Sequence, residues 1–195
     1  MPNPPKLSGG RMHTRGYLPH VDAEGSAQFI TFRLADSMPQ NLLNQWRTEL
    51  ASGEITDADL RKRIEYFLDS GYGSCSLRDR RIANEVRETL LKWNDKRYRV
   101  VAWAIMPNHV HLLIEMLEGH PLSEVMHSIK SYTAHEANRI LGRKGRFWAA
   151  ESFDRYIRDA SHFRNTVKYI EDNPAKAGLC RRPEDWEFSS AYVGS

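Results

Sequence analysis

The order of strand and helix patterns predicts an α+β fold of the ferredoxin-like βαββαβ type: an antiparallel sheet with helices on one face and one helix added at the C-terminal end. Three observations predict it. Residues 27–34, AQFITFRL, alternate and are rich in β-branched and aromatic side chains, which is typical of a strand. Residues 97–105 and 109–116 form two further strand patterns, joined by a tight turn at 106–108. Helical apolar spacing over 80–93 and 122–141 flanks that hairpin.

The remaining elements follow from apolar spacing and helix breakers. Residues 39–69 contain two helical segments around a Ser-Gly break at 52–53, and we expect them to form an insertion. An edge strand is expected from 147 to 157. The last helix is expected over about 161–172, ending at Asn173-Pro174, because proline disfavours helical geometry at the residue before it.

The composition indicates one folded domain with an extension. The chain has 195 residues, of which 41% are hydrophobic and 27% charged, so we expect a flexible basic arm over 1–16 and a single domain over 17–195. Cys75 and Cys180 lie far apart, which argues against a zinc ribbon or a disulfide scaffold. No apolar stretch resembles a signal core or a membrane span, so we expect a cytoplasmic protein with no membrane partner.

Basic residues gather in two places, although the net charge is only +3. Both clusters lack acidic neighbours and are candidates for contacts with phosphates, although surface basic clusters are also commonly just solvated. The candidates are Lys6, Arg11 and Arg15 in the arm, and Arg139, Arg143, Lys144 and Arg146 after the long helix.

Two histidines open the strand pattern at 109–116. Side chains alternate along a strand, so His109 and His111 point to the same face, with their Cα atoms roughly 7 Å apart. Such a pair can hold one divalent ion through its ring nitrogens. Chance produces a His-x-His pair often enough that ordinary sheet histidines remain an alternative on spacing alone.

The last helix can complete a site. Tyr169 and Asn173 lie one turn apart on a polar stripe, beside the apolar stripe of Phe163, Val167 and Ile170. If this helix crosses the face that carries the histidines, a phenol and an amide oxygen reach a metal-held phosphate together. Two plainer roles stay open: a tyrosine at a helix–sheet boundary and an asparagine that ends a helix before proline.

Several segments together resemble a known family, the REP-associated tyrosine transposases, which are bacterial relatives of the single-tyrosine HUH transposases. The resemblance covers nearly the whole chain in order. It rests on Gly16-Tyr-Leu-Pro-His20, Gln28-Phe-Ile-Thr-Phe-Arg-Leu34, Trp103-Ala-Ile-Met-Pro-Asn-His-Val-His111, Phe147-Trp148, Glu151-Ser-Phe-Asp-Arg155 and Tyr169-Ile-Glu-Asp-Asn-Pro-Ala-Lys-Ala-Gly-Leu179.

The resemblance implies an HUH fold with His109 and His111 as the metal-binding pair, Mg²⁺ or Mn²⁺ as the metal, and Tyr169 as the nucleophile. Asn173 stands where relatives place a third polar ligand, often a glutamine, so its role is less certain. The rival tyrosines, Tyr132 and Tyr156, have no Asn or Gln one helical turn later.

The reaction that this family implies is cleavage and rejoining of single-stranded or hairpin DNA through a 5′-phosphotyrosine link. The DNA would be palindromic chromosomal repeats, with the basic clusters on the backbone and with Tyr17 and Trp148 as candidates to stack on unpaired bases. Core packing is the alternative role for Trp148. The protein would then work at the nucleoid.

Two other functions stay open: a structured-DNA binding protein that does not cleave, and a metal hydrolase that uses activated water. The hydrolase leaves Tyr169 without a task. We expect a monomer, because the helical segment 39–69 can cap the surface that smaller relatives use for pairing, but a dimer is not excluded.

Overall fold

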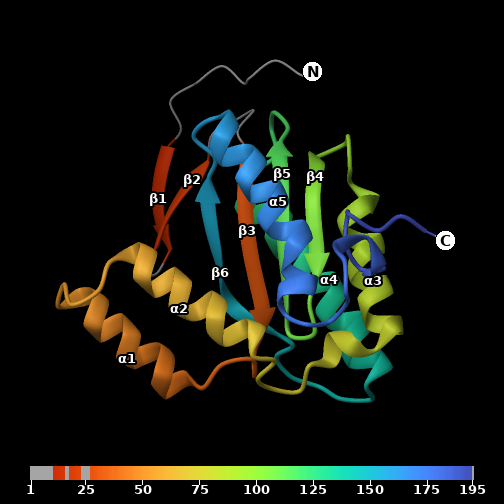
Figure 1. Ribbon diagram of the computed structural model, residues 1–195, viewed down its shortest axis with the longest axis horizontal. Coiled ribbons are helices and arrows are strands. Elements are labelled where there is room, and N and C mark those ends of the chain that lie inside the picture. Colours follow the sequence, from red (N-terminus) through yellow and green to blue (C-terminus); the bar gives the residue numbers. More distant parts are fainter. Residues whose placement is uncertain (1–10, 16–17, 23–26, 195) are drawn as a thin grey trace.

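A four-stranded antiparallel sheet in the order β4-β5-β3-β6 forms the centre of the protein (Figure 1). The computed structural model describes residues 11–15, 18–22 and 27–194. The strands of the sheet are β3 (Ala27–Leu34), β4 (Tyr98–Ile105), β5 (His109–Met116) and β6 (Trp148–Tyr156). The first of these lies between the third and the fourth, which is the ferredoxin-like arrangement, so the predicted α+β class is confirmed.

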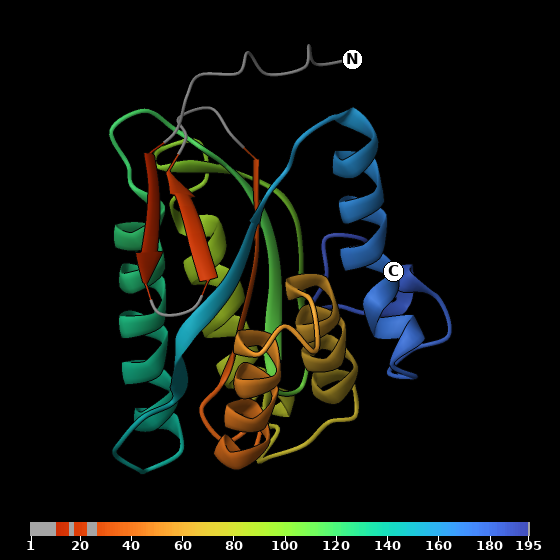
Figure 2. The same cartoon turned by 90° about the vertical axis from the view of Figure 1, so that its left-hand side faces the viewer.

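Helices cover both faces of this sheet. Helices α3 (Arg80–Lys92) and α4 (Leu122–Ile140) lie on one face and α5 (Ala160–Lys176) on the other (Figure 2). The alternation of β5 accounts for this division: Val110 and Leu112 pack in the core with α3 and α4, whereas Leu113 packs with Ile170 of α5. In the part of the chain that the structure describes, no helix is long and apolar enough to cross a bilayer.

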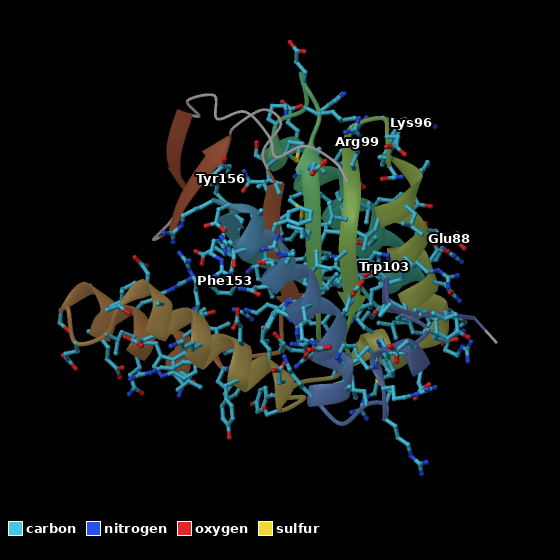
Figure 3. All side chains as sticks on the ribbon, turned by 45° about the horizontal axis from the view of Figure 1, so that its top comes forward. Glu88, Lys96, Arg99, Trp103, Phe153 and Tyr156 are labelled. Atoms are coloured by element: carbon cyan, nitrogen blue, oxygen red, sulfur yellow. The ribbon has the colours of Figure 1, made fainter. Side chains whose placement is uncertain are left out.

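The expected insertion is a helical hairpin, α1 (Gln40–Ala51) and α2 (Asp57–Asp69). It has a small core of its own that includes Leu43, Leu60 and Ile64, and Phe153 of β6 packs against that core (Figure 3). Helix α2 begins with a capping box: the side chain of Thr56 accepts a hydrogen bond from Asp59 N–H, and the carboxylate of Asp59 accepts one from Thr56 N–H. The hairpin is therefore a folded unit, and its second helix lies on the α5 side of the sheet (Figure 1).

A second, two-stranded sheet precedes the main one and was not predicted. Strands β1 (Arg11–Arg15) and β2 (Leu18–Asp22) are antiparallel, and β2 lies beside β6. They fall in the expected arm and just after it, where no clear apolar alternation marks a strand. Two short 3₁₀ helices, Ser76–Arg78 and Pro183–Asp185, complete the elements.

Helix α5 does not end at Asn173, as predicted, but continues through Pro174 to Lys176. A proline in the last turn removes only one amide hydrogen, and Pro174 gains burial in return. Gly178, just beyond the end of the helix, has a φ of 71°, which allows the reversed turn in which Leu179 N–H donates to Pro174 O at 2.9 Å. Asn173 is therefore inside the last part of the helix, one turn after the tyrosine.

Candidate metal and tyrosine site

The two histidines are buried side by side on the α5 face of the sheet. His109 is 1% exposed and His111 is fully buried, and their Nε2 atoms lie 3.0 Å apart. Both therefore point to one face, as strand alternation predicts.

The neighbours of His109 fix its tautomer. Asn108 Nδ2 donates to Leu68 O at 3.1 Å and to Tyr72 O at 2.9 Å, which leaves Asn108 Oδ1 as an acceptor. That oxygen lies 2.7 Å from His109 Nδ1, so Nδ1 carries the hydrogen. In the neutral ring, His109 Nε2 then presents a lone pair toward His111.

The second ring is held by the neighbouring strand. His111 Nδ1 lies 2.9 Å from Thr31 Oγ1, its register partner on β3. Burial lowers the pKa of His111 to about 3. Burial and the proximity of His111 lower the pKa of His109 well below its usual value. Both rings are thus neutral near pH 7, which is the form that binds metals.

A carboxylate from the helical hairpin joins the pair, and the sequence analysis did not predict it. Asp69 is the last residue of α2, and its Oδ1 lies 3.8 Å from His109 Nε2. The ligand atoms of Asp69, His109 and His111 all lie within 4.8 Å of one another. Burial, together with the charge of the nearby Glu65, raises the pKa of Asp69 to about 6, although Lys176 opposes the rise.

The predicted nucleophile lies against this group. The ring centroid of Tyr169 is 5.5 Å from that of His111 and 5.9 Å from that of Phe29. Its hydroxyl is buried, and the side chain of Glu65 on α2 is its hydrogen-bonding neighbour. Burial raises the pKa of Tyr169 far above its usual value, the charge of Glu65 adds to the rise, and Arg155 opposes it. The phenol is therefore protonated at neutral pH.

Among the described residues, Asp69 Oδ1 and Asn173 Oδ1 are buried oxygens without a hydrogen-bond partner. Asn173 is 1% exposed and lies one helical turn after the tyrosine. Buried oxygens without partners are rare because they are costly. The position of Asp69 Oδ1 beside two neutral histidines fits a site that takes up a divalent cation, since the donors are imidazole nitrogens and a carboxylate oxygen.

The rival tyrosines lie elsewhere. Tyr132 is on α4, across the sheet from the histidines, and is 48% exposed. Tyr156, labelled in Figure 3, pairs with Gln28 on β3, whereas His109 pairs with Arg33. Five residues along a strand correspond to roughly 17 Å, so Tyr156 is at the far end of the sheet.

Residues 74–173, just over half of the chain, match the family model for IS200-like transposases. The chain belongs to the IS200-like transposase family. Two curated relatives are REP-associated tyrosine transposases. The protein of Escherichia coli K12 is 29% identical over 99 residues, which cover 50% of this chain and 57% of that protein. The protein of Haemophilus influenzae Rd is 27% identical over 105 residues, 49% of this chain and 60% of its own.

The chain thus matches a little more than half of the length of those relatives. The expected family resemblance is confirmed. A solved structure of a REP-associated tyrosine transposase bound to a REP hairpin superposes with a TM-score of 0.56. The match is 20% identical and covers 94% of this chain and 92% of that one. The shared fold is the conclusion that this similarity supports.

The second basic cluster of the chain is on the surface. Arg139, Arg143, Lys144 and Arg146 are exposed, at the end of α4 and in the turn before β6. That turn lies at the end of the sheet where β5 begins with His109. Leu34 shows this, because it pairs with Trp148 and its own N–H donates to Asn108 O at 2.9 Å. Contacts of this cluster with DNA stay a prediction.

The other predicted DNA contacts divide into two groups. Lys6 and Tyr17 lie outside the described residues, and so do the side chains of Arg11 and Arg15, whose backbones form the ends of β1. Trp148 is a core residue: it is 4% exposed, and its Nε1 donates to Thr133 Oγ1 at 2.9 Å. This packing leaves no free ring face for a base, so the structure favours the core role.

Four residues around the site had no role in the sequence analysis: Thr31, Glu65, Asn108 and Arg155. Alternation along β3 could have placed Thr31 on the histidine face. Asp69 could have been noticed as unusual, because an acidic residue in the last turn of a helix is disfavoured by the helix dipole.

Proposed function

We propose that this transposase cleaves and rejoins single-stranded or hairpin DNA through a covalent bond to Tyr169. The observation that carries the proposal is the contact between the rings of Tyr169 and His111, whose centroids lie 5.5 Å apart. The hydrolase alternative gives this tyrosine no task.

His109 and His111 would hold the metal through their Nε2 atoms, and Asn173 would be a polar ligand from α5, as the family resemblance implies. A bound Mg²⁺ or Mn²⁺ supplies polarisation of the scissile phosphate and neutralises charge that develops in the transition state. Asn108 and Thr31 orient the two rings from behind through their hydrogen bonds to the Nδ1 atoms.

Tyr169 Oη would attack the scissile phosphorus. The new Oη–P bond forms as the P–O3′ bond breaks, which leaves a 5′-phosphotyrosine and a 3′-hydroxyl. The phenolic proton must pass to the leaving 3′ oxygen. Glu65 exerts the largest charge effect on the hydroxyl and is our candidate to relay that proton. Attack by the 3′-hydroxyl reverses the reaction and rejoins the strand.

The substrate that we propose is a palindromic repeat folded as a hairpin, since the structural relative was solved with a REP hairpin. The exposed cluster Arg139–Arg146 would contact its backbone. Such a protein would work on chromosomal DNA in the cytoplasm.

The test is incubation with labelled hairpins, each carrying single-stranded flanks, from the genome that encodes the protein, in Mg²⁺ or Mn²⁺. We expect a covalent protein–DNA adduct with the wild type and with Tyr156→Phe, and none with Tyr169→Phe, which should still bind the hairpin. An undiminished adduct in Tyr169→Phe would exclude Tyr169. Binding without any 3′-hydroxyl product would favour a non-cleaving DNA-binding protein, and cleavage without an adduct a hydrolase.

A further inference from the structure

We propose that Asp69, carried by the inserted hairpin α1–α2, is the anionic ligand of the cation at His109 and His111, so that cation binding fastens the hairpin to the sheet. The inference rests on the histidine site of the proposed function. It assigns the insertion a part in building the site.

The first argument is the spacing of the candidate ligand atoms. Adjacent ligand atoms of an octahedral Mg²⁺ or Mn²⁺ ion lie roughly 3 Å apart, because each metal–ligand bond is about 2.1 Å long. The two Nε2 atoms already have that spacing, at 3.0 Å. Asp69 Oδ1 is 3.8 Å from His109 Nε2 and needs a shift of about 1 Å, within reach of a side-chain rotation.

The position of Asp69 in its helix is the second step. As the last residue of α2 it lies at the negative end of the helix dipole, and the last turn contains no basic residue to compensate. Its Oδ1 is buried without a hydrogen bond, although the side chain as a whole is 32% exposed. The neighbouring carboxylate of Glu65 adds repulsion. A divalent cation would offset the helix dipole, give the buried oxygen a partner and reduce the repulsion from Glu65.

A hydrogen-bonded link to the sheet is the third step. The amide of Asn108 accepts from His109 through Oδ1 and donates through Nδ2 to the carbonyls of Leu68 and Tyr72, on either side of Asp69. The same side chain therefore positions a histidine of the sheet and the end of α2 that carries the carboxylate. These hydrogen bonds hold the backbone around Asp69 close to His109, so the position of the carboxylate does not depend on charge alone.

The consequence concerns the tyrosine. Helix α2 also carries Glu65, which acts on the Tyr169 hydroxyl. A cation that binds Asp69 would hold this helix against the site, so the metal and the proton relay would be assembled together.

The test uses the full chain without DNA and Mn²⁺ as the probe. Mn²⁺ affinity is measured by calorimetric titration, and amide hydrogen exchange of residues 57–69 is measured with and without Mn²⁺. Asp69→Asn keeps the shape and removes the charge. Asp57→Asn makes the same change on an exposed residue of the same helix, about 18 Å away. His109→Ala is the reference for loss of the site.

We expect Asp69→Asn to weaken Mn²⁺ binding by roughly tenfold or more and to abolish the slowing of exchange that Mn²⁺ causes in residues 57–69. Asp57→Asn should behave as the wild type. Wild-type affinity in Asp69→Asn, or equal slowing of exchange in that variant, would overturn the inference. If His109→Ala also bound Mn²⁺ as the wild type does, the histidine site of the proposed function would fail as well. If His109→Ala lost Mn²⁺ binding while Asp69→Asn kept it, only the role of Asp69 would be overturned.

Discussion

Asn108 shows how one side chain can organise a site without touching its substrate. It lies in the turn between β4 and β5 and is 1% exposed. Its amide forms three bonds, one to the ring of His109 and two to backbone carbonyls around the end of α2. A residue with both a donor and an acceptor is required there, which is a physical reason for an asparagine directly before the first histidine.

Asn108→Asp should separate these two roles. The carboxylate keeps an acceptor for His109 but turns an oxygen toward Leu68 O and Tyr72 O, so we expect the free energy of unfolding to fall by about 2–3 kcal/mol. Urea unfolding measures this change. In the control Asn138→Asp, a surface amide loses one bond to Gly145 O, and the loss should be under about 1 kcal/mol. Equal losses in the two variants would contradict the role of Asn108.

At the scale of elements, apolar periodicity predicted most of the fold. The strands at 27–34 and 109–116 and both hairpin helices were predicted, because alternation and helical spacing are local properties of the sequence. The shared face of His109 and His111 followed from the same alternation. The two histidines of the candidate metal site were therefore predictable from one strand.

The parts that were missed depend on tertiary contacts. Helical spacing shows which side of α2 is apolar, but not that its last residue docks beside β5, so Asp69 was not predicted. The preference of the residue before proline gave the wrong end for α5, because burial of Pro174 outweighs one lost hydrogen bond. Strands β1 and β2 pair with each other in a segment that lacks clear alternation.

Lys130 links two elements, and its titration should be visible in stability. Its Nζ donates to Ala149 O at 2.7 Å and to Ala150 O at 3.0 Å, which ties α4 to β6. Burial lowers the pKa of Lys130 from 10.5 to about 8, and the charge of Arg33 adds to this effect. Between these pH values the unfolded chain binds a proton that the folded protein has released, so stability should rise with pH across this window.

The measurement compares the wild type with Lys130→Met from pH 7 to 10.5 by urea unfolding. As the pH rises through that range, we expect the free energy of unfolding of the wild type to increase by about 1–2 kcal/mol relative to that of the variant. This figure allows for solvent screening of a partly exposed group. Other titrating groups cancel in the difference. Parallel stability curves would show that Lys130 keeps an ordinary pKa.

At the scale of the whole molecule, both edges of the sheet are covered. The C-terminal segment pairs with β4, where Ile105 N–H donates to Phe188 O at 2.8 Å and Ser190 N–H to Trp103 O at 2.9 Å. At the other edge β2 lies beside β6 (Figure 2). Free edges are the usual route by which one sheet pairs with another; here the C-terminal segment bonds to β4, and β2 lies beside β6 without joining its sheet.

We therefore predict a monomer. Light scattering after size-exclusion chromatography should give a mass near 22.6 kDa at micromolar concentration, without DNA. A mass of twice that value, unchanged on dilution, would show that the covered edges do not prevent pairing. Adding the hairpin should increase the mass by one DNA molecule per protein.

The position of the covalent bond tests the central claim most directly. The adduct formed with a hairpin in Mn²⁺ is digested with protease and nuclease, and the linked peptide is sequenced by mass spectrometry. We expect a nucleotide attached through its 5′-phosphate to Tyr169 and to no other residue. A nucleotide on Tyr132 or Tyr156, or a 3′-phosphate link, would contradict the assignment of Tyr169 as the nucleophile beside His109 and His111.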